Sequence, residues 1–367
     1  MMNVPTNSPT RRAVRLWLLT VAALMFVTLV VGGATRLTGS GLSIVEWKPV
    51  TGIVPPLDAS AWQAEFEKYQ AIPQYRERNL GMSLAEFQTI YWWEWVHRML
   101  ARLTGAAFLL PFLWFLWRRA IDPPLRARLW GIFGLGAALG AVGWWMVSSG
   151  LSERVTVSQY RLAFHLTLAS VIFAAVLWTA QSIAPRAPIV VPARIRAAAA
   201  ALVVLVIAQI YLGALVAGLH AGLVYNTWPL IDGGFVPDAA RLWFGAPLWR
   251  NFFENALTVQ FDHRMLAYAL WFLALLHAAD IALTLRSRPA LTGALILAGA
   301  ITLQAALGIA TLLEQAPLAL ALLHQAMAIA VLTVAVLHAQ RLARPAASRA
   351  GEPAAAHAAL RPEQRAT

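Results

Sequence analysis

The chain has 367 residues, of which 59 % are hydrophobic and 13 % are charged, and its mean hydropathy is +0.62. Soluble domains carry about 25 % charged residues, so this composition excludes a soluble globular protein and indicates a polytopic membrane protein. The chain contains no cysteine, which excludes disulfides, thiolate metal sites, iron–sulfur clusters and cysteine nucleophiles. Any metal must therefore be held by His, Met, Asp or Glu.

Eight apolar runs are long enough to cross a bilayer, which requires about 20 residues each. In chain order we expect them at 14–34, 91–117, 128–149, 159–182, 197–218, 258–284, 291–312 and 318–339. We expect the first run to be retained and not removed as a signal peptide, although Val31-Gly32-Gly33-Ala34 resembles a weak cleavage site. The sequence therefore predicts an all-α polytopic membrane protein with eight transmembrane helices.

The distribution of Lys and Arg predicts which way the spans run. An even number of spans places both termini on one side, and that side carries 17 basic and 4 acidic residues against 12 and 13 on the other. Positive loops stay inside, so we expect a cytoplasmic N-terminal segment 1–13 and a disordered cytoplasmic tail 340–367. The long connections 35–90 and 219–257 then face the outer side as ordered loops. The high pI follows from this asymmetry, and no basic stripe with interleaved aromatic residues indicates a nucleic-acid partner.

An internal repeat divides the chain into two halves. The segment His97-Arg98-Met99-Leu100-Ala101 recurs letter for letter as His263-Arg264-Met265-Leu266-Ala267. The repeat predicts two tandem four-helix bundles, 14–182 and 197–339, in parallel topology.

Four histidines lie at matched depths in the even spans, and these are His97, His165, His263 and His324. A single intramembrane histidine is as readily a hydrogen-bonded packing residue as a ligand. Four at equivalent places, two in each half and with no thiolate or further ligand beside them, favour axial ligation of haem iron over a zinc site. The sequence therefore predicts one haem site in each half, near the outer face.

His277 and His338 leave a second arrangement open. Each follows a site histidine by 14 residues on the same span, which places it about 21 Å deeper on a similar face. Two stacked haems, as in electron-transfer cytochromes b, would use such pairs. The first half has Pro111 and Thr179 at the corresponding positions, which argues against that arrangement.

Glu94 distinguishes the two halves. It precedes His97 by three residues, and the equivalent position before His263 is Gln260. An ionisable group beside one haem indicates chemistry in the first half and electron transfer or a structural role in the second. The alternative is a carboxylate solvated at the start of its helix, where the dipole favours it. The residues alone do not separate these two interpretations.

The chain resembles the haem A synthase family from about residue 30 to 330. In the first half the resemblance rests on Gly33-Ala34-Thr35-Arg36-Leu37-Thr38-Gly39-Ser40-Gly41-Leu42-Ser43, Glu46-Trp47-Lys48-Pro49, Gly52-Ile53-Val54-Pro55-Pro56-Leu57, Glu65-Phe66-Glu67-Lys68-Tyr69 and Glu94-Trp95-Val96-His97-Arg98. In the second half it rests on Ala217-Gly218-Leu219, Ala221-Gly222-Leu223-Val224-Tyr225-Asn226-Thr227-Trp228-Pro229-Leu230, Phe261-Asp262-His263-Arg264 and Leu323-His324-Gln325.

The resemblance implies an activity and a set of roles. His263 and His324 would hold a resident haem b through its iron, and His97 and His165 would receive the substrate haem O. Glu94 matches the family's catalytic glutamate. The implied reaction oxidises the C8 methyl of haem O to a formyl group through successive hydroxylations and loss of water. One branch of the family has a cysteine pair in the first outer loop, and this chain resembles the cysteine-free branch of proteobacteria and mitochondria.

The resemblance also implies partners and a location. The reaction implies membrane lipid around the chain, contact with a haem O synthase and with oxidase assembly factors, and an unidentified electron acceptor. The short leader favours a bacterial inner membrane over a mitochondrial one. Four arginines at the outer rim are candidates to pair with haem propionates, with interfacial snorkelling as the alternative, and they are Arg36, Arg98, Arg161 and Arg264.

Two other functions compete with this prediction. A di-haem electron-transfer cytochrome b, of the quinol or ferric reductase type, would use His277 and His338. A transporter would need charged midplane residues, but the only large polar residues deep in the odd spans are Gln209 and Gln304. We interpret the glycines of the third span, Gly134, Gly136 and Gly140, as sites of close helix packing.

Overall fold

The computed structural model describes residues 9–184 and 189–343, and within these ranges every regular element is a helix. Eight of the helices are long and apolar enough to cross a membrane, as predicted. These are α1 (Pro9–Leu37), α4 (Leu84–Trp117), α5 (Pro123–Ser148), α6 (Gln159–Ser182), α7 (Ala193–Gly218), α11 (Ala256–Thr284), α12 (Arg288–Leu313) and α13 (Leu318–Leu342). The short helices are η1 (Thr51–Ile53), α2 (Ala59–Gln70), α3 (Pro73–Arg78), α8 (Ala221–Val224), α9 (Ala239–Leu242), η2 (Leu248–Arg250) and α10 (Asn251–Glu254).

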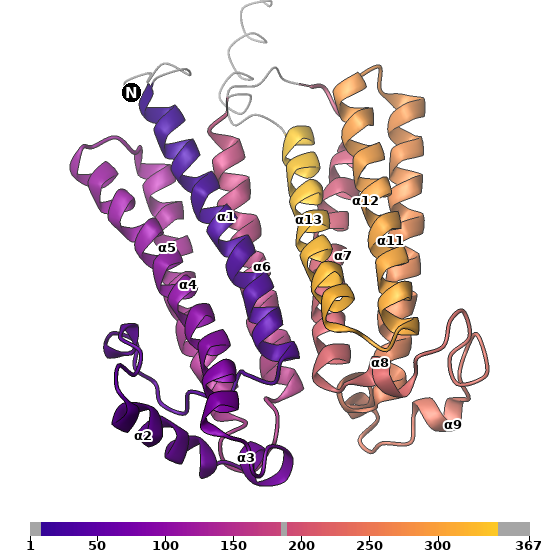
Figure 1. Ribbon diagram of the computed structural model, residues 1–367. Coiled ribbons are helices and arrows are strands. Elements are labelled where there is room, and N and C mark those ends of the chain that lie inside the picture. Colours follow the sequence, from indigo (N-terminus) through magenta and orange to yellow (C-terminus); the bar gives the residue numbers. More distant parts are fainter. Residues whose placement is uncertain (1–8, 185–188, 344–367) are drawn as a thin grey trace, which may run out of the picture.

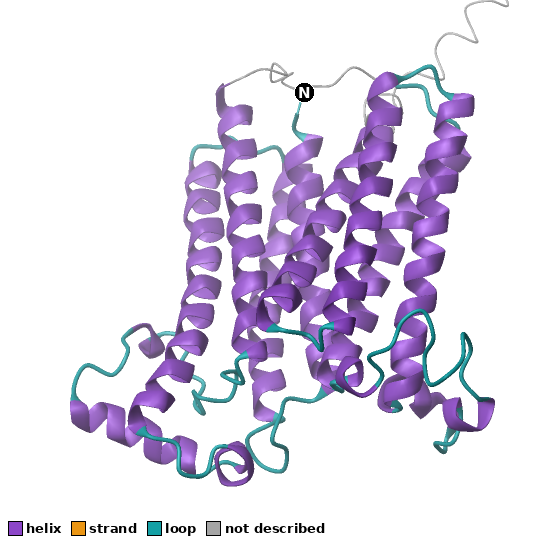
Figure 2. Cartoon of the chain, turned by 45° about the vertical axis from the view of Figure 1, so that its right-hand side comes forward, coloured by secondary structure: helices purple, strands orange, loops and turns teal. Residues whose placement is uncertain are grey.

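The long helices form two groups that lie side by side (Figure 1). One group contains α1, α4, α5 and α6, and the other contains α7, α11, α12 and α13. Contacts of α6 with α7 and of α13 with α1 and α6 join the groups. The short helices α2, α3, α8 and α9 all lie at the end of the bundle opposite the start of α1, and we call this the loop end (Figures 1 and 2).

The apolar interior is shared between the two groups. One buried cluster contains Leu18 of α1, Phe112 of α4, Leu129 of α5 and Leu332 of α13. Of the long helices α6 is the most enclosed, whereas α4 and α5 turn most of their apolar surface outward. Outward apolar faces suit contact with lipid, which agrees with the membrane protein that the composition predicted.

Polar contacts also join the groups near the loop end. The side chain of Gln325 on α13 donates a hydrogen bond to the carbonyl of Leu29 on α1 at 2.6 Å. The guanidinium of Arg36, close to the end of α1, donates to the carbonyl of Ala217 on α7. These bonds fix the height of α1 relative to the second group.

The helix α4 begins seven residues before the predicted span at 91–117. Ser83 caps it through a reciprocal capping box with Glu86, which satisfies the first backbone N–H groups. The residues before 91 are too polar for a bilayer, so α4 projects beyond the apolar stretch. Its projecting turns pack against α2 through Phe66, Tyr69 and Phe87.

The predicted outer loops and ends differ from the structure in detail. The connection 35–90 is ordered and contains α2 and α3 as well as the start of α4. The predicted segment 1–13 overlaps α1 from Pro9 onward, and the predicted tail 340–367 begins inside α13. The remainder of both segments, 1–8 and 344–367, lies outside the described residues, so the expected disorder of the tail stays a prediction.

The interpretation of the α5 glycines as close packing sites is wrong. Apart from the adjacent backbone of α5 itself, no atom of the described residues lies within 4 Å of where a Cβ would stand on Gly134, Gly136 or Gly140. The glycines of this helix therefore border open space, except for Gly143, which meets a side chain of the candidate site.

Candidate functional site

The structure brings the four predicted ligand histidines together in two pairs. His97 on α4 and His165 on α6 lie within electrostatic range of each other, and so do His263 on α11 and His324 on α13. All four side chains are partly exposed and do not belong to the packed core. Each pair belongs to one of the two groups of helices described above.

Every histidine of the set faces a glycine on a neighbouring helix. A Cβ on Gly32 would lie 2.7 Å from Cε1 of the His97 ring, and one on Gly143 would lie 3.1 Å from Cε1 of His165. The second half repeats the arrangement. A Cβ on Gly213 would lie 3.1 Å from Cε1 of His263, and one on Gly308 would lie 2.8 Å from Cε1 of His324. Real Cβ atoms almost never come closer than about 3 Å to another atom, so a Cβ at Gly32 or Gly308 would displace the imidazole. A Cβ at Gly143 or Gly213 would be a tight contact, and the ring would have to move by a few tenths of an ångström.

The four glycines also define one depth in the bundle. Each lies five residues before the last residue of its helix, in α1, α5, α7 and α12. These helices all end at the loop end, so the four imidazoles lie at a common level about 7.5 Å inside it.

The ring nitrogens have donor or acceptor capacity to spare. Nδ1 of His97, His165 and His324 is buried without a hydrogen-bond partner. Unpartnered imidazole nitrogens and side-chain-free glycine faces fit a flat macrocycle held by its metal. No third His, Cys, Asp or Glu joins either pair among the described residues, so a tetrahedral zinc site does not fit as well.

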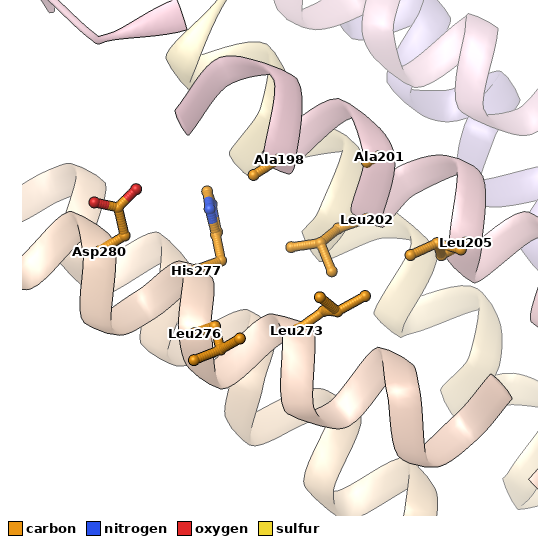
Figure 3. A pocket seen from close by; sticks show the side chains of 8 residues that line it. All are labelled: Ala198, Ala201, Leu202, Leu205, Leu273, Leu276, His277 and Asp280. Atoms are coloured by element: carbon orange, nitrogen blue, oxygen red, sulfur yellow. The ribbon is translucent and has the colours of Figure 1, made fainter. Parts of the chain in front are cut away.

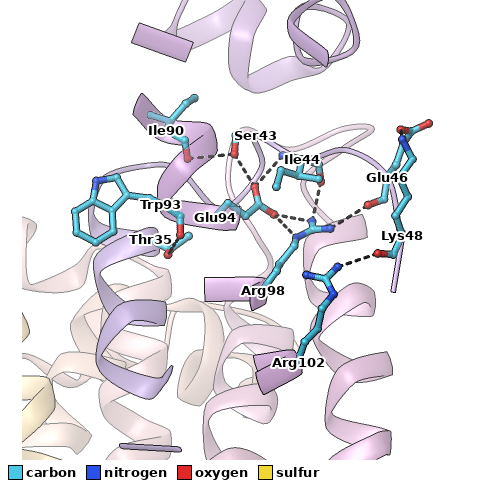
Figure 4. A network of polar contacts seen from close by, with 10 residues as sticks. All are labelled: Thr35, Ser43, Ile44, Glu46, Lys48, Ile90, Trp93, Glu94, Arg98 and Arg102. Atoms are coloured by element: carbon cyan, nitrogen blue, oxygen red, sulfur yellow. Dashed lines mark hydrogen bonds and ion pairs between the residues drawn. The ribbon is translucent and has the colours of Figure 1, made fainter. Parts of the chain in front are cut away.

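Glu94, three residues before His97 on α4, occupies the centre of a polar network (Figure 4). Its Oε2 accepts hydrogen bonds from the Ser43 hydroxyl and from the backbone N–H of Ile44, each at 2.8 Å. Its Oε1 accepts from Nη2 and Nε of Arg98, at 2.6 and 3.1 Å. Arg98 also donates to the carbonyl oxygens of Ile44 at 2.7 Å and Glu46 at 2.9 Å. Glu94 therefore joins the helix that carries His97 to the first outer loop.

One interpretation of Glu94 left open by the sequence is wrong. The carboxylate is 2 % exposed, and α4 begins ten residues before it, so it is not solvated at a helix start. Gln260, at the equivalent position of the second half, is 3 % exposed, and its amide approaches only the carbonyl of Tyr225, at 3.4 Å. The first half thus has a fully bonded carboxylate where the second half has a weakly bonded amide.

The comparisons with known proteins agree with this geometry. Residues 15–336 match the COX15-CtaA family, which is described as cytochrome oxidase assembly protein. The chain belongs to this family. A relative from Rhodopseudomonas palustris strain HaA2 is named heme A synthase, and it is 61 % identical over 337 residues that cover 92 % of each chain. Another heme A synthase, from Bradyrhizobium diazoefficiens strain USDA 110, is 61 % identical over 94 % of this chain and 95 % of its own length.

In this member of the family the four predicted rim arginines are bonded to protein carbonyls. Arg36 donates to Ala217, as described above, and Arg98 is paired with Glu94. Arg161 donates to the carbonyl of Trp145 at 2.6 Å, and its guanidinium lies 4.6 Å from the centre of the Trp145 ring. The structure therefore gives these three side chains hydrogen-bond partners within the protein.

Arg264 differs from the other three because one of its buried donors has no partner. It donates to the carbonyls of Tyr225 and Leu230 at 3.2 and 3.3 Å, and its Nε is buried without a partner. No acidic side chain forms an ion pair with it in the described part of the chain. A buried guanidinium with a spare donor remains a candidate for a carboxylate ligand such as a propionate.

Four charges tie the short helix α2 to the first outer loop. Nζ of Lys68 lies 2.8 Å from a carboxylate oxygen of Glu46 and 2.8 Å from one of Glu65, and Lys48 lies 2.6 Å from Glu46. Hydrogen bonds from Lys48 and Lys68 lower the pKa of Glu46 below its ordinary value. These side chains are partly exposed, so each ion pair contributes little to stability by itself. Together they hold α2 against the loop that also contacts Glu94.

His277 and His338, which lie outside the two candidate pairs, do not have the spacing of a haem site in this structure. Nε2 of one ring lies 2.9 Å from Nε2 of the other, and both side chains are 4 % exposed. An ion between two imidazole nitrogens on opposite sides needs roughly 4 Å, because each metal–nitrogen bond is about 2 Å. The pair instead makes a direct hydrogen bond between α11 and α13.

A pocket of about 250 Å³ opens beside this hydrogen bond (Figure 3). It lies between α7 and α11, and its lining is apolar apart from His277 and Asp280. Asp280 is bonded to Arg194 at 2.8 Å and is therefore not free to act as a ligand. The pocket lies far from the candidate sites, at the end of the bundle away from the loops.

Sequence reasoning missed the partners of Glu94. Ser43 and the N–H of Ile44 are about fifty residues away along the chain, whereas Arg98 lies one turn further along α4, and only Ser43 and Arg98 stood inside the recognised motifs. It also recorded Gln209 and Gln304 merely as polar residues in apolar spans. Both donate to the backbone carbonyl of a site histidine.

Proposed function

We propose that this chain is a haem A synthase that oxidises the C8 methyl of haem O to a formyl group. Family membership supports a role in haem A biosynthesis. The single observation that carries the proposal is the difference between two otherwise matched histidine pairs. Both pairs sit against glycines at one depth, but only the first half has a bonded carboxylate three residues before a site histidine, where the second half has Gln260.

The proposed roles follow from that difference. His263 and His324 would hold a resident haem b, and His97 and His165 would receive the substrate haem O. The resident haem, when bound, supplies a one-electron carrier between the substrate and an acceptor. The protein contributes the imidazoles, the glycine faces that keep them in place, and the enclosing helices that exclude water.

Glu94 is proposed to be the catalytic carboxylate of the first half. Oxidation of a methyl group releases protons as well as electrons, and a carboxylate at this place can accept a proton or stabilise developing positive charge. To accept a proton from the substrate, one carboxylate oxygen must first lose one of its present hydrogen bonds. The Ser43 hydroxyl can rotate away most easily. Arg98 would then keep the other oxygen in position.

The proposed topology places both termini in the cytoplasm and the loop end outside the inner membrane of a bacterium. The excess of Lys and Arg near the ends of the chain supports this orientation. Haem O would arrive from a haem O synthase through the lipid, and the product would pass to oxidase assembly factors. The electron acceptor is unidentified.

The activity is tested by producing the chain, with a haem O synthase, in a bacterium that makes no haem A. The non-covalent haems are extracted and identified by chromatography and mass. A new formyl haem that is absent from a control without this chain would support the proposal. Haems B and O alone, in a folded and haem-loaded protein, would contradict it and favour an electron-transfer cytochrome b.

A further inference from the structure

The residue one turn before each of the four site glycines differs between the two halves of the chain. Residues four apart in a helix share a face, so this residue lies beside the same histidine but one turn further from the loop end. In the second half the position is occupied by Gln209 before Gly213 and by Gln304 before Gly308. In the first half it is occupied by Thr28 on α1 and Leu139 on α5.

Both glutamines reach the backbone of the histidine that they face. Nε2 of Gln209 donates to the carbonyl oxygen of His263 at 2.9 Å, and Nε2 of Gln304 donates to the carbonyl oxygen of His324 at 3.0 Å. Each bond joins two neighbouring helices at the residue that carries the imidazole. The bond therefore limits rotation and sliding of the histidine's helix at that point.

The same amides also contact the imidazole rings. Nε2 of Gln209 lies 3.0 Å from Nδ1 of His263, and Nε2 of Gln304 lies 3.5 Å from Nε2 of His324. The amide oxygen of each glutamine is buried and has no hydrogen-bond partner. An imidazole that ligates iron through Nε2 carries its proton on Nδ1, and that N–H needs an acceptor. The amide of Gln209 does not supply that acceptor here, because its nitrogen faces both the ring and the His263 carbonyl, so its contribution is the bond to the carbonyl.

The first half lacks this support. The hydroxyl of Thr28 bonds to the carbonyl of Leu24 at 2.8 Å and to the hydroxyl of Thr104 at 3.3 Å, and so does not serve His97. The backbone of Thr28 contacts the His97 ring, as the backbone of Gln304 contacts the His324 ring, so this contact is common to both halves and only the side-chain bond differs. Leu139 has no polar group to offer His165. His97 and His165 therefore have no side-chain hydrogen bond from the residue four positions before the glycine that they face.

We propose that Gln209 and Gln304 are positioning residues that make the haem of the second half permanent, and that Thr28 and Leu139 leave the haem of the first half exchangeable. The inference rests on the proposed function, because it assumes that the second half keeps its haem while the first half receives and releases one. It explains how one repeated site can serve two purposes: the ligands and glycines are the same, and the residue behind them differs.

The test measures haem retention and does not depend on formation of haem A. The holoprotein is purified in detergent and mixed with an excess of apomyoglobin, and the transfer of haem is followed by absorbance. We expect Gln209→Leu and Gln304→Leu each to speed loss of the second-half haem by about tenfold to a hundredfold, the usual effect of removing a ligand's outer partner. Leu139→Ala is the matched control and is expected to leave that rate unchanged. Retention at the wild-type rate in both glutamine variants would overturn the proposal.

A variant that introduces a glutamine in the first half covers the case in which a glutamine-to-leucine variant fails to fold. Leu139→Gln places the amide before Gly143, and we expect it to slow the release of haem from the first half by a similar factor. Unchanged release in a folded Leu139→Gln protein would also overturn the proposal.

The two proposals can fail separately. An inactive chain that holds haem through His263, and loses it faster as Gln209→Leu, would contradict the proposed reaction and support this inference. If His263→Ala retained the full haem complement, the second half would not hold a haem and both would fall.

Discussion

Replacement of Glu94 by Gln is the sharpest perturbation of the proposed site, because it changes charge with little change of shape. The carboxylate accepts four hydrogen bonds, two of them from Arg98, whose side chain is only 17 % exposed. A glutamine has one acceptor oxygen, so it can serve the loop or Arg98 but not both, and its amide nitrogen faces another donor. Leaving one member of a buried ion pair without its partner costs about 3–5 kcal/mol.

Three measurements test the effect of this substitution. We expect haem A formation, measured per resident haem in cells that supply haem O, to fall by about 10²- to 10⁴-fold, the range for loss of a group that transfers protons. We expect the absorbance of the His263/His324 haem to be unchanged, because that pair lies in the other half. Amide hydrogen exchange of residues 43–46 should accelerate, because the loop loses its anchor on α4. Glu94→Ala is expected to abolish product in the same way.

Two control variants decide whether the charge or the loop attachment matters. Ser43→Ala removes one of the four donors and keeps the charge, so it should loosen the loop by about 1–2 kcal/mol and reduce product only modestly. Gln260→Leu alters the equivalent position of the second half and should preserve product. A wild-type rate in Glu94→Gln would refute the reasoning. So would a loss in Ser43→Ala as large as the loss in Glu94→Gln, since Glu94 would then act only through the loop.

Three further predictions concern the ligands, a glycine face and the outer loop. His97→Ala should lose product but keep the spectrum of the resident haem. His263→Ala should lose both the product and that spectrum. Identical spectra in the two variants would contradict the assignment of the halves. Gly143→Leu should displace the imidazole that it faces and lower retention of the first-half haem in the apomyoglobin assay, because even a Cβ there lies 3.1 Å from the ring; normal retention would contradict the glycine argument. Hydrogen bonds from lysines lower the pKa of Glu46, so its ion pair with Lys68 stabilises the loop above the ordinary carboxylate pKa and is lost as the pH falls through the lowered value. Hydrogen exchange in 46–68 should therefore rise at acidic pH in the wild type but not in Glu46→Gln, and the effect should be under about 1 kcal/mol because the pair is partly exposed.

The sequence by itself determined the membrane architecture and the main members of the site. Hydropathy alone located eight spans, because a bilayer demands a run of apolar residues of nearly fixed length. The letter-for-letter repeat around His97 and His263 placed the histidines in matched pairs before any contact was known. The ends of the helices were less accurate, since caps such as Ser83 extend α4 into water, where hydropathy carries no signal.

Only the tertiary structure decided how these residues are partnered. The bonds of Glu94 to Ser43 and Ile44 cross about fifty positions of sequence, and no local pattern records such a contact. Likewise, His277 and His338 have the spacing of a ligand pair but lie in direct contact with each other.

The glycines show the same division. A glycine in a span is compatible with close packing or with open space, and the two differ only in what stands opposite. Gly136 faces nothing within 4 Å, whereas Gly143, two turns along the same helix, faces the ring of His165. Hydrophobic pattern fixes how far each residue lies from the membrane surface, but the neighbour across the bundle depends on how separate helices pack, and that is a property of the folded chain.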